Sequence, residues 1–150
     1  RKPPCIMVIE LDGKAFLSWD DIEEQVDRLA EQINRMDKKP FYLYGVPRGG
    51  LIPATWLSHK TGIKYQQINS IEISKIADLS HIMIIDDICD SGETIQKLKR
   101  SFPKCQTATL YHKITACDKP DIYGTVSIYD WLYFPWENQQ SPEIRDNTYE

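Results

Sequence analysis

The stretch that most constrains the fold is "IMIIDDICDSGETI", which runs from Ile82 to Ile95. Its first four residues are apolar, and such a run bounded by polar residues is typical of a buried strand. Three carboxylates then follow within five positions, and a turn of small residues comes after them. Residues 92–102, "GETIQKLKRSF", have a helical pattern that Pro103 ends. The stretch therefore predicts a strand, an acidic loop and a helix in direct succession.

The rest of the chain predicts further strands that alternate with helices. In residues 18–36, apolar side chains recur at three- and four-residue spacing behind Ser18, a natural N-cap, so an amphipathic helix is expected. Residues 51–62 predict a second helix that ends at Gly62. Strands are expected at residues 6–9, 41–45, 63–68, 82–86 and 105–111, with a brief one at 71–73. This alternation favours an α/β fold, with an open, mainly parallel twisted sheet flanked by helices and ligands beyond the C-terminal strand ends.

Length and charge limit the classes of function. The 150 residues suit one domain, expected over residues 1–137, with a polar tail at residues 138–150. The net charge of -4 argues against nucleic acid or an anionic membrane as a partner. The four cysteines lack CxxC spacing, which indicates reduced thiols in a cytoplasmic protein. No segment has the pattern of a signal peptide or reaches transmembrane length.

The acidic loop has the composition of an anion and metal site. A helix N-terminus attracts phosphate through its unpaired N–H groups and partial positive charge. Gly92 lets the backbone approach a ligand closely, and Ser91 and Thr94 add hydroxyls. The nearby carboxylates would repel a bare phosphate, so we expect them to face ribose hydroxyls or a Mg²⁺ ion. The alternative is that Asp90 or Ser91 merely caps the helix, but the clustering of these residues after a buried strand argues against it.

The same stretch closely resembles the motif with which type I phosphoribosyltransferases bind phosphoribosyl pyrophosphate (PRPP). In that family an apolar run precedes two acids and a Thr/Ser-Gly-x-Thr turn. The resemblance implies that Asp86 and Asp87 bind the ribose hydroxyls or the metal, with Asp87 the expected Mg²⁺ ligand. It also implies that Asp90 is one of the PRPP-binding residues and that the 5′-phosphate is bound by Ser91, Gly92, Glu93 (through its backbone only) and Thr94.

A second stretch, "YGVPRGGLIPA" at residues 44–54, resembles the pyrophosphate loop of the same family. The resemblance implies that Arg48 and Gly49 bind pyrophosphate. In the family the peptide bond before Arg48 can be cis, which turns an N–H group toward the ligand. Pro47 does not itself favour a cis bond there, because the bond in question follows the proline rather than preceding it. Without the first motif, this loop would be no more than a glycine turn before a helix.

Asp90 and residues farther along the chain narrow the class of base that the resemblance implies. In family members that act on 6-oxopurines, the acid at the position of Asp90 lies near nitrogen 7 of the base and serves as the general base. Lys113 matches the lysine that donates to the 6-oxo group. Trp131 matches the aromatic residue that stacks on the purine, and the backbones of Leu132 and Tyr133 would address its 2-position. Taken alone, Lys113 would be a surface lysine and the aromatic cluster a core or subunit interface.

Taken together, residues 18–137 look like a compact bacterial xanthine–guanine phosphoribosyltransferase. The resemblance implies a purine salvage transferase that uses Mg²⁺ and PRPP on guanine, xanthine or hypoxanthine, with a base-binding hood formed mainly by about residues 113–137. It also implies a homo-oligomer, dimer or tetramer. One departure stands out, because residues 69–81, where the family has its flexible lid, are short and carry one lysine and no tyrosine. A nucleotide- or PRPP-binding regulator with little turnover therefore stays open, as does the preferred base.

Overall fold

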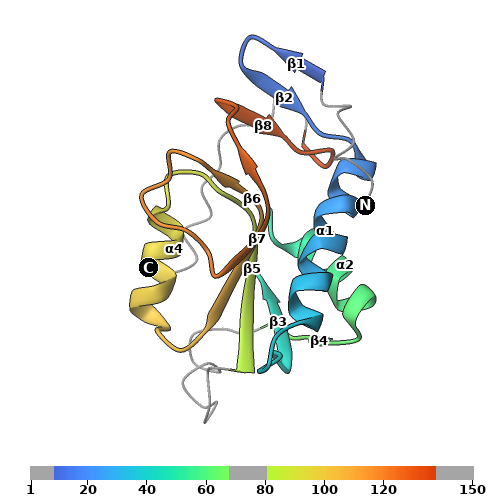
Figure 1. Ribbon diagram of the computed structural model, residues 1–150, viewed down its shortest axis with the longest axis vertical. Coiled ribbons are helices and arrows are strands. Elements are labelled where there is room, and N and C mark those ends of the chain that lie inside the picture. The colour runs from blue at the N-terminus through green and yellow to red at the C-terminus, as the bar shows by residue number, and fades with distance from the viewer. Residues whose placement is uncertain (1–8, 68–80, 138–150) are drawn as a thin grey trace.

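The computed structural model describes residues 9–67 and 81–137 (Figure 1). The predicted strand at 71–73, the polar tail at 138–150 and nearly all of the lid interval lie outside the described residues, as does most of the strand expected at 6–9.

A five-stranded parallel sheet forms the centre, in the order β4-β3-β5-β6-β7. Its strands are β3 (Tyr42–Gly45), β4 (Lys64–Tyr65), β5 (Ile82–Cys89), β6 (Gln106–Lys113) and β7 (Ile122–Ser127). The predicted α/β class with a mainly parallel sheet is confirmed.

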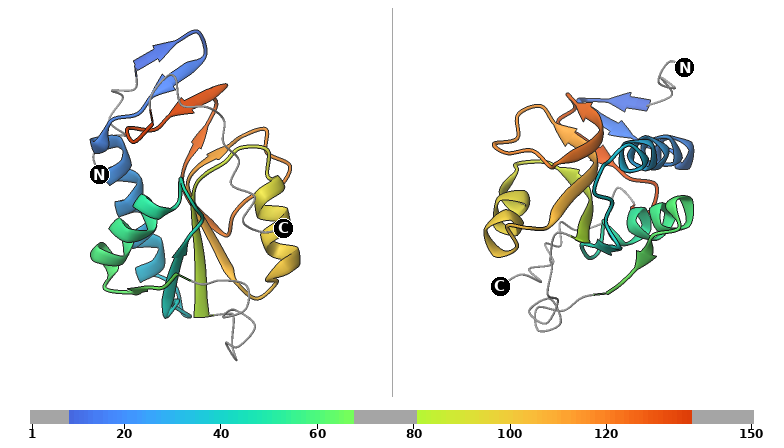
Figure 2. Two further views of the ribbon diagram at one scale, coloured as in Figure 1. Left: turned by 180° about the vertical axis from the view of Figure 1, so that it is seen from behind. Right: turned by 60° about the horizontal axis from the view of Figure 1, so that its bottom comes forward.

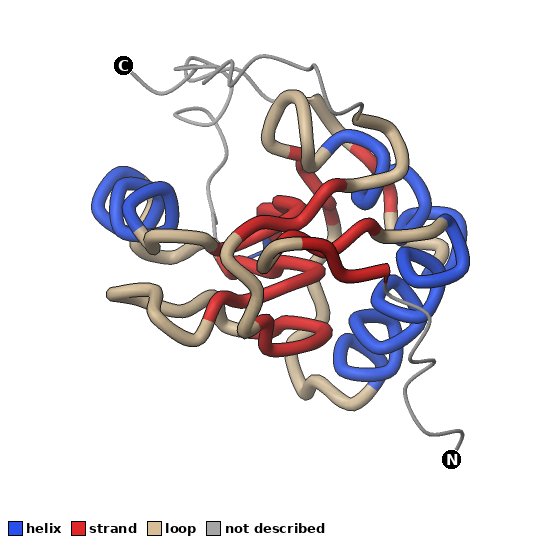
Figure 3. Tube along the Cα trace, turned by 90° about the horizontal axis from the view of Figure 1, so that it is seen from above, coloured by secondary structure: helices blue, strands red, loops and turns tan. Residues whose placement is uncertain are grey.

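Helices cover both faces of this sheet, which gives three layers (Figure 3). Helices α1 (Trp19–Asn34) and α2 (Leu51–Thr61) pack on one face, and α4 (Glu93–Ser101) packs on the other (Figure 1). The predicted caps are present: the Ser18 hydroxyl accepts the Asp21 N–H, and Gly62 ends α2 in the left-handed conformation. None of the helices in these described ranges is long and apolar enough to span a membrane.

The central strand, β5, separates two apolar cores. Met83 and Ile85 pack toward α1 and α2, whereas Ile82 and Ile84 pack toward α4, as the two-residue period of a strand requires. The strand was predicted to end at Asp86, with the two acids leaving it for a loop, and this boundary is wrong. Pairing with β6 continues as far as Cys89, opposite His112, so the paired acids lie on the strand itself.

A second, smaller sheet lies beyond one end of the large sheet (Figures 1 and 2). It contains β1 (Ile9–Leu11), β2 (Lys14–Phe16) and β8 (Trp131–Tyr133), in the order β1-β2-β8. The first two strands form an antiparallel hairpin, and β8 pairs with β2 in parallel. The hood was expected mainly from residues 113–137, but two of the three strands of this sheet come from the start of the chain.

The sequence contains a signal for this hairpin that the predicted elements did not use. Asp12 and Gly13 form an Asp-Gly pair, and both have positive φ angles, 53° and 74°. Such a pair between short extended segments is typical of a two-residue hairpin turn.

Candidate active site

The loops that follow β3 and β5 meet at the C-terminal end of the sheet. Gly45 and Ile85 are register partners, and the Val46 N–H donates to the Ile85 carbonyl at 2.8 Å. The next turn places Gly49 directly against the Asp87 carboxylate, so closely that a Cβ atom at Gly49 would overlap it. The Pro47–Arg48 peptide bond in this turn is cis. The predicted pyrophosphate loop and the predicted metal-binding acid are therefore in contact.

The paired acids Asp86 and Asp87 are half-buried, and each accepts a backbone N–H group from the residue after it. The Asp87 N–H donates to Asp86 at 2.9 Å, and the Ile88 N–H donates to Asp87 at 2.7 Å. Burial raises the pKa of both carboxyls, and the neighbouring charge of Asp87 raises the pKa of Asp86 further. Two acids that are costly to ionise side by side suit a site in which a cation is bound.

The predicted phosphate turn leads into α4 as expected. Gly92, with a φ of 89°, is the N-cap residue of α4, and the first-turn N–H groups of a helix lack intrahelical acceptors. The Ser91 hydroxyl accepts the Glu93 N–H at 3.2 Å, but the N-cap is Gly92 rather than the Asp90 or Ser91 weighed as an alternative. Thr94 is exposed in the first turn. The arrangement leaves a short, open cradle at a positive helix end, which suits a phosphate group.

The segment between β6 and β7 packs against the phosphate turn and forms a hydrogen bond with it. The Cys117 N–H donates to the Ser91 carbonyl at 2.8 Å. A Cβ atom at Gly92 would lie 2.7 Å from the Asp118 backbone nitrogen, so only glycine fits beneath this segment. The phosphate turn is thus held by residues far from it in sequence.

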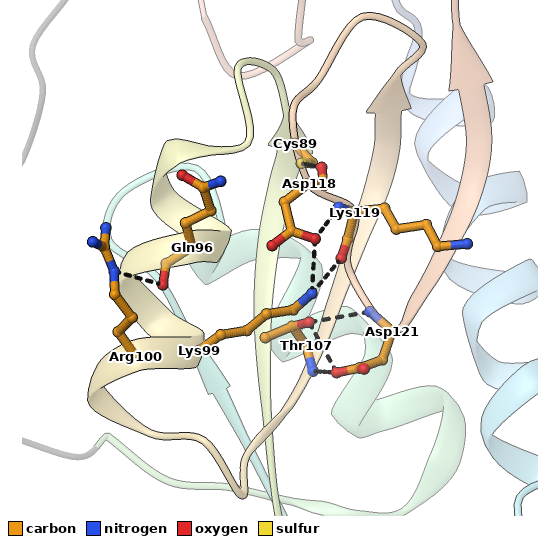
Figure 4. A network of polar contacts seen from close by, with 8 residues as sticks. All are labelled: Cys89, Gln96, Lys99, Arg100, Thr107, Asp118, Lys119 and Asp121. Atoms are coloured by element: carbon orange, nitrogen blue, oxygen red, sulfur yellow. Dashed lines mark hydrogen bonds and ion pairs between the residues drawn. The ribbon is translucent and has the colours of Figure 1, made fainter.

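An ion pair ties the same segment to α4 (Figure 4). The Lys99 ammonium donates to the Asp118 carboxylate at 2.9 Å and to the Lys119 carbonyl at 3.0 Å. The hydrogen bond from Lys99 lowers the pKa of Asp118. The Cys89 thiol, at the end of β5, donates to the Asp118 carbonyl at 3.3 Å. Hydrogen bonds and an ion pair therefore connect β5, α4 and the segment between β6 and β7 around the phosphate turn.

Two residues with predicted roles at the purine contact each other directly. The register that sets Cys89 opposite His112 brings the next residue of each strand, Asp90 and Lys113, side by side. Their carboxylate and ammonium groups form an ion pair at 3.2 Å. Lys113 also donates to the backbone carbonyl of Asp130 at 3.0 Å. A proton acceptor and a cationic donor thus lie together between the phosphate turn and the small sheet.

The other residues predicted to contact the base lie on β8. Trp131 is 37% exposed, and its ring lies 6.4 Å from the Tyr133 ring in an edge-on arrangement. Leu132 is buried against the main core. The Tyr133 carbonyl accepts the Leu17 N–H at 2.9 Å, so this backbone group already has a partner within the small sheet.

One further carboxylate was missed by the sequence predictions. Glu137 lies near Asp87 and Arg48, since both charges act on it. Burial, and then the charge of Asp87, raise the pKa of Glu137, while Arg48 acts to lower it. The Glu137 N–H donates to the Phe134 carbonyl at 2.9 Å in the turn after β8. The only sequence signal was its place as the acid that ends an aromatic run.

The donor atoms present fit a Mg²⁺ ion that a substrate helps to bind. Within residues 9–67 and 81–137, no group of three or more histidine, cysteine or acidic side chains converges as a complete metal site. Mg²⁺ is commonly bound by one or two carboxylates together with water and substrate phosphates. Asp86 and Asp87 supply such a pair of hard oxygen donors beside the predicted pyrophosphate loop.

Comparison with known proteins agrees with this geometry, although no family model matches the chain. A purine phosphoribosyltransferase from Pyrococcus horikoshii is 28% identical, with a TM-score of 0.68 over 89% of this chain and 99% of that one. A xanthine-guanine-hypoxanthine phosphoribosyltransferase from Helicobacter pylori is 26% identical, with a TM-score of 0.68. The match covers 82% of this chain and 91% of that one. A hypothetical protein from Neisseria gonorrhoeae, solved with bound ppGpp, shares the fold at 20% identity and a TM-score of 0.66 over 88% and 93%. With the two motif loops joined at the end of a parallel sheet, these similarities show the type I phosphoribosyltransferase fold and support that family for this chain.

Proposed function

We propose that the protein is a cytosolic 6-oxopurine phosphoribosyltransferase of purine salvage. It would transfer the phosphoribosyl group of PRPP to guanine, xanthine or hypoxanthine and release pyrophosphate. The observation that carries this proposal is the 3.2 Å ion pair between Asp90, just before the phosphate turn, and Lys113, at the end of β6. The P. horikoshii and H. pylori proteins, both purine phosphoribosyltransferases, support it.

At the phosphate end, the turn from Ser91 to Thr94 would bind the 5′-phosphate through backbone N–H groups and hydroxyls. Arg48 and Gly49 would bind pyrophosphate. Asp86 and Asp87 would bind the ribose hydroxyls and Mg²⁺, and a bound Mg²⁺ would neutralise charge on the pyrophosphate leaving group. A nearby cation favours the ionised form of a carboxyl, so it would offset the burial that raises the pKa of both acids.

At the base end, Lys113 is a donor without acceptor capacity, so it can bind a 6-oxo group but not the N–H face of a 6-amino group. Asp90 would accept the proton from nitrogen 7 of the base as the base attacks the ribose. Without substrate the two side chains neutralise each other, and base binding would exchange this ion pair for contacts with the purine. Carboxylates around the ribose would stabilise the positive charge that develops on it.

The test is a panel of guanine, xanthine, hypoxanthine and adenine, each incubated with PRPP, Mg²⁺ and the purified protein. We expect nucleotide from at least one 6-oxopurine and little or none from adenine. A known phosphoribosyltransferase assayed in parallel validates the reagents. If that control turns over and this protein forms no nucleotide from any of the three 6-oxopurines, the enzymatic proposal fails.

A second candidate is a nucleotide-binding regulator with the same fold and little turnover. It is motivated by the short interval at residues 69–81, which has one lysine and no tyrosine where the family has its lid. The N. gonorrhoeae protein with bound ppGpp has the same fold. Tight nucleotide binding without turnover in the base panel would favour this candidate, whereas turnover comparable to the control enzyme would exclude it.

A further inference from the structure

We propose that the β1–β2 hairpin is a positioning element of the base site, and that Gly13 and Phe16 are its key residues. This inference rests on the proposed function for the meaning of Trp131 and Lys113. It concerns a part of the chain in which neither motif lies. The hairpin would act by holding β8 and, through Asp130, the acceptor of Lys113.

The first link is the tip of the hairpin. The carbonyl of Gly13 accepts the backbone N–H groups of both Asp130, at 2.9 Å, and Trp131, at 3.4 Å. Asp12 and Gly13 both have positive φ angles, a turn conformation that orients this carbonyl toward β8. The Asp130 carboxylate packs over the Cα atom of Gly13, where a Cβ atom would lie 2.5 Å from its oxygen. The start of β8 is therefore set by the hairpin turn.

The second link is the pairing of β2 with β8. Their register sets Lys14 opposite Trp131 and Phe16 opposite Tyr133. The Phe16 and Tyr133 rings stack with centroids 4.9 Å apart and planes 13° apart. Because side chains alternate along a strand, Trp131 and Tyr133 share one face with Phe16, and the other face is buried. Stacking on that shared face constrains the strand that carries Trp131.

The third link joins the hairpin to Lys113. Asp130 donates its N–H to Gly13 and accepts the Lys113 ammonium on its carbonyl. Lys113 in turn pairs with Asp90. A displaced hairpin turn would thus move both the stacking tryptophan and the acceptor that holds the lysine. These contacts reach Asp90, next to the phosphate turn, but none of them involves residues 91–94, so base binding should change while PRPP binding does not.

The test compares two alanine substitutions that meet the same backbone strain. Gly13 and Gly62 have φ angles of 74° and 75°, but Gly62 ends α2 with nothing within 4 Å of its added Cβ atom, whereas Gly13 lies beneath Asp130. For Gly13→Ala we expect the KM for the base to rise about tenfold, as small misplacements of binding groups produce, with the KM for PRPP unchanged. Gly62→Ala should leave both constants near wild type. Phe16→Ala should resemble Gly13→Ala. Phe41→Ala removes a ring that packs at a tilt against His81, away from the small sheet, and should resemble Gly62→Ala.

A second readout does not depend on activity. Hydrogen exchange of the Asp130 and Trp131 amides, measured by NMR, should accelerate in Gly13→Ala and stay at the wild-type rate in Gly62→Ala. The inference would be overturned if Gly13→Ala and Gly62→Ala changed the exchange rates of these amides equally. It would also be overturned if Gly13→Ala left those rates unchanged. A rise in the base KM matched by an equal rise in the PRPP KM would also overturn it. If the wild-type protein turns over no 6-oxopurine, the proposed function fails, and amide exchange alone decides whether the hairpin positions β8.

Discussion

The phosphate end and the base end of the candidate site are built in different ways. Residues 86–94 supply most of the phosphate end from one strand, one turn and one helix start, all contiguous in sequence. The base end brings together Gly13, Asp90, Lys113 and the segment from Asp130 to Tyr133. A site whose residues are contiguous can be predicted from a sequence motif. The residues of a composite site come together only when particular strands become neighbours in the fold.

Even the contiguous end is not wholly local. The segment after Lys113 returns over the phosphate turn, and the Lys99–Asp118 ion pair fastens it there (Figure 4). The two ends therefore share one connection, which starts after Lys113 at the proposed base end and then covers Ser91 and Gly92. The predictions below test how separate the two ends are, and they run from the largest expected effect to the smallest.

The largest effect is expected at Asp90, which belongs to the phosphate motif by sequence but contacts Lys113. Asp90→Asn should lower kcat by about 10²-fold or more, the range typical of a lost general base. PRPP binding, measured by calorimetry, should stay near wild type, which would assign Asp90 to the base end. An equal loss of PRPP affinity and turnover would contradict this assignment.

The second-largest effect is expected from Gly49→Ala at the phosphate end. The added methyl group would overlap the Asp87 carboxylate and separate the pyrophosphate loop from the paired acids. Steady-state assays should show the KM for PRPP rising about tenfold, since close backbone approach is lost, with a much smaller change for the base. Gly62→Ala is the control, because its Cβ atom meets nothing. A KM for PRPP that stays at the wild-type value would remove Gly49 from the pyrophosphate site.

A smaller effect is expected from Lys99→Met, which removes the ion pair to Asp118 while keeping most of the apolar stem. The KM for PRPP should rise about threefold, because partly exposed ion pairs contribute little and backbone bonds still hold the segment. Arg100→Met is the matched control, since the Arg100 guanidinium donates to the Gln96 carbonyl within α4. If both variants change the KM for PRPP equally, the phosphate end does not depend on the ion pair.

The smallest effect concerns stability rather than turnover. The raised pKa of Asp86 means that the folded state binds its proton more tightly than the unfolded chain. Stability is therefore lost as pH rises from the ordinary carboxyl range through that raised pKa. Asp86→Asn should increase the free energy of unfolding of the substrate-free protein at pH 7, and the gain should vanish near pH 4, about the ordinary carboxyl pKa.

Urea denaturation at the two pH values measures this difference. Asp37→Asn, at an exposed position, should leave both curves unchanged. A loss of stability in Asp86→Asn at pH 7 would show that the Asp86 carboxylate is stabilising without substrate, against its raised pKa.

The sequence predictions were accurate where a feature depends on local sequence, and they failed where it depends on contacts between distant segments. The helices over 18–36, 51–62 and 92–102 are confirmed to within two residues at each end, because caps and apolar spacing are local properties. The end of β5 was wrong, since pairing with β6 rather than composition extends the strand to Cys89. The β1–β2 hairpin and Glu137 were missed, although the Asp-Gly pair at the hairpin turn was a readable signal.

By itself, the sequence determined the strand–turn–helix unit around residues 82–101, the parallel α/β class and the identity of the chemical groups at the strand ends. These follow from short-range periodicity, capping and turn chemistry. Only the tertiary structure decided that Asp90 pairs with Lys113, that Gly49 touches Asp87 and that the start of the chain supports Trp131. Those contacts depend on strand order and register, which are set when the whole core packs and which no local pattern encodes.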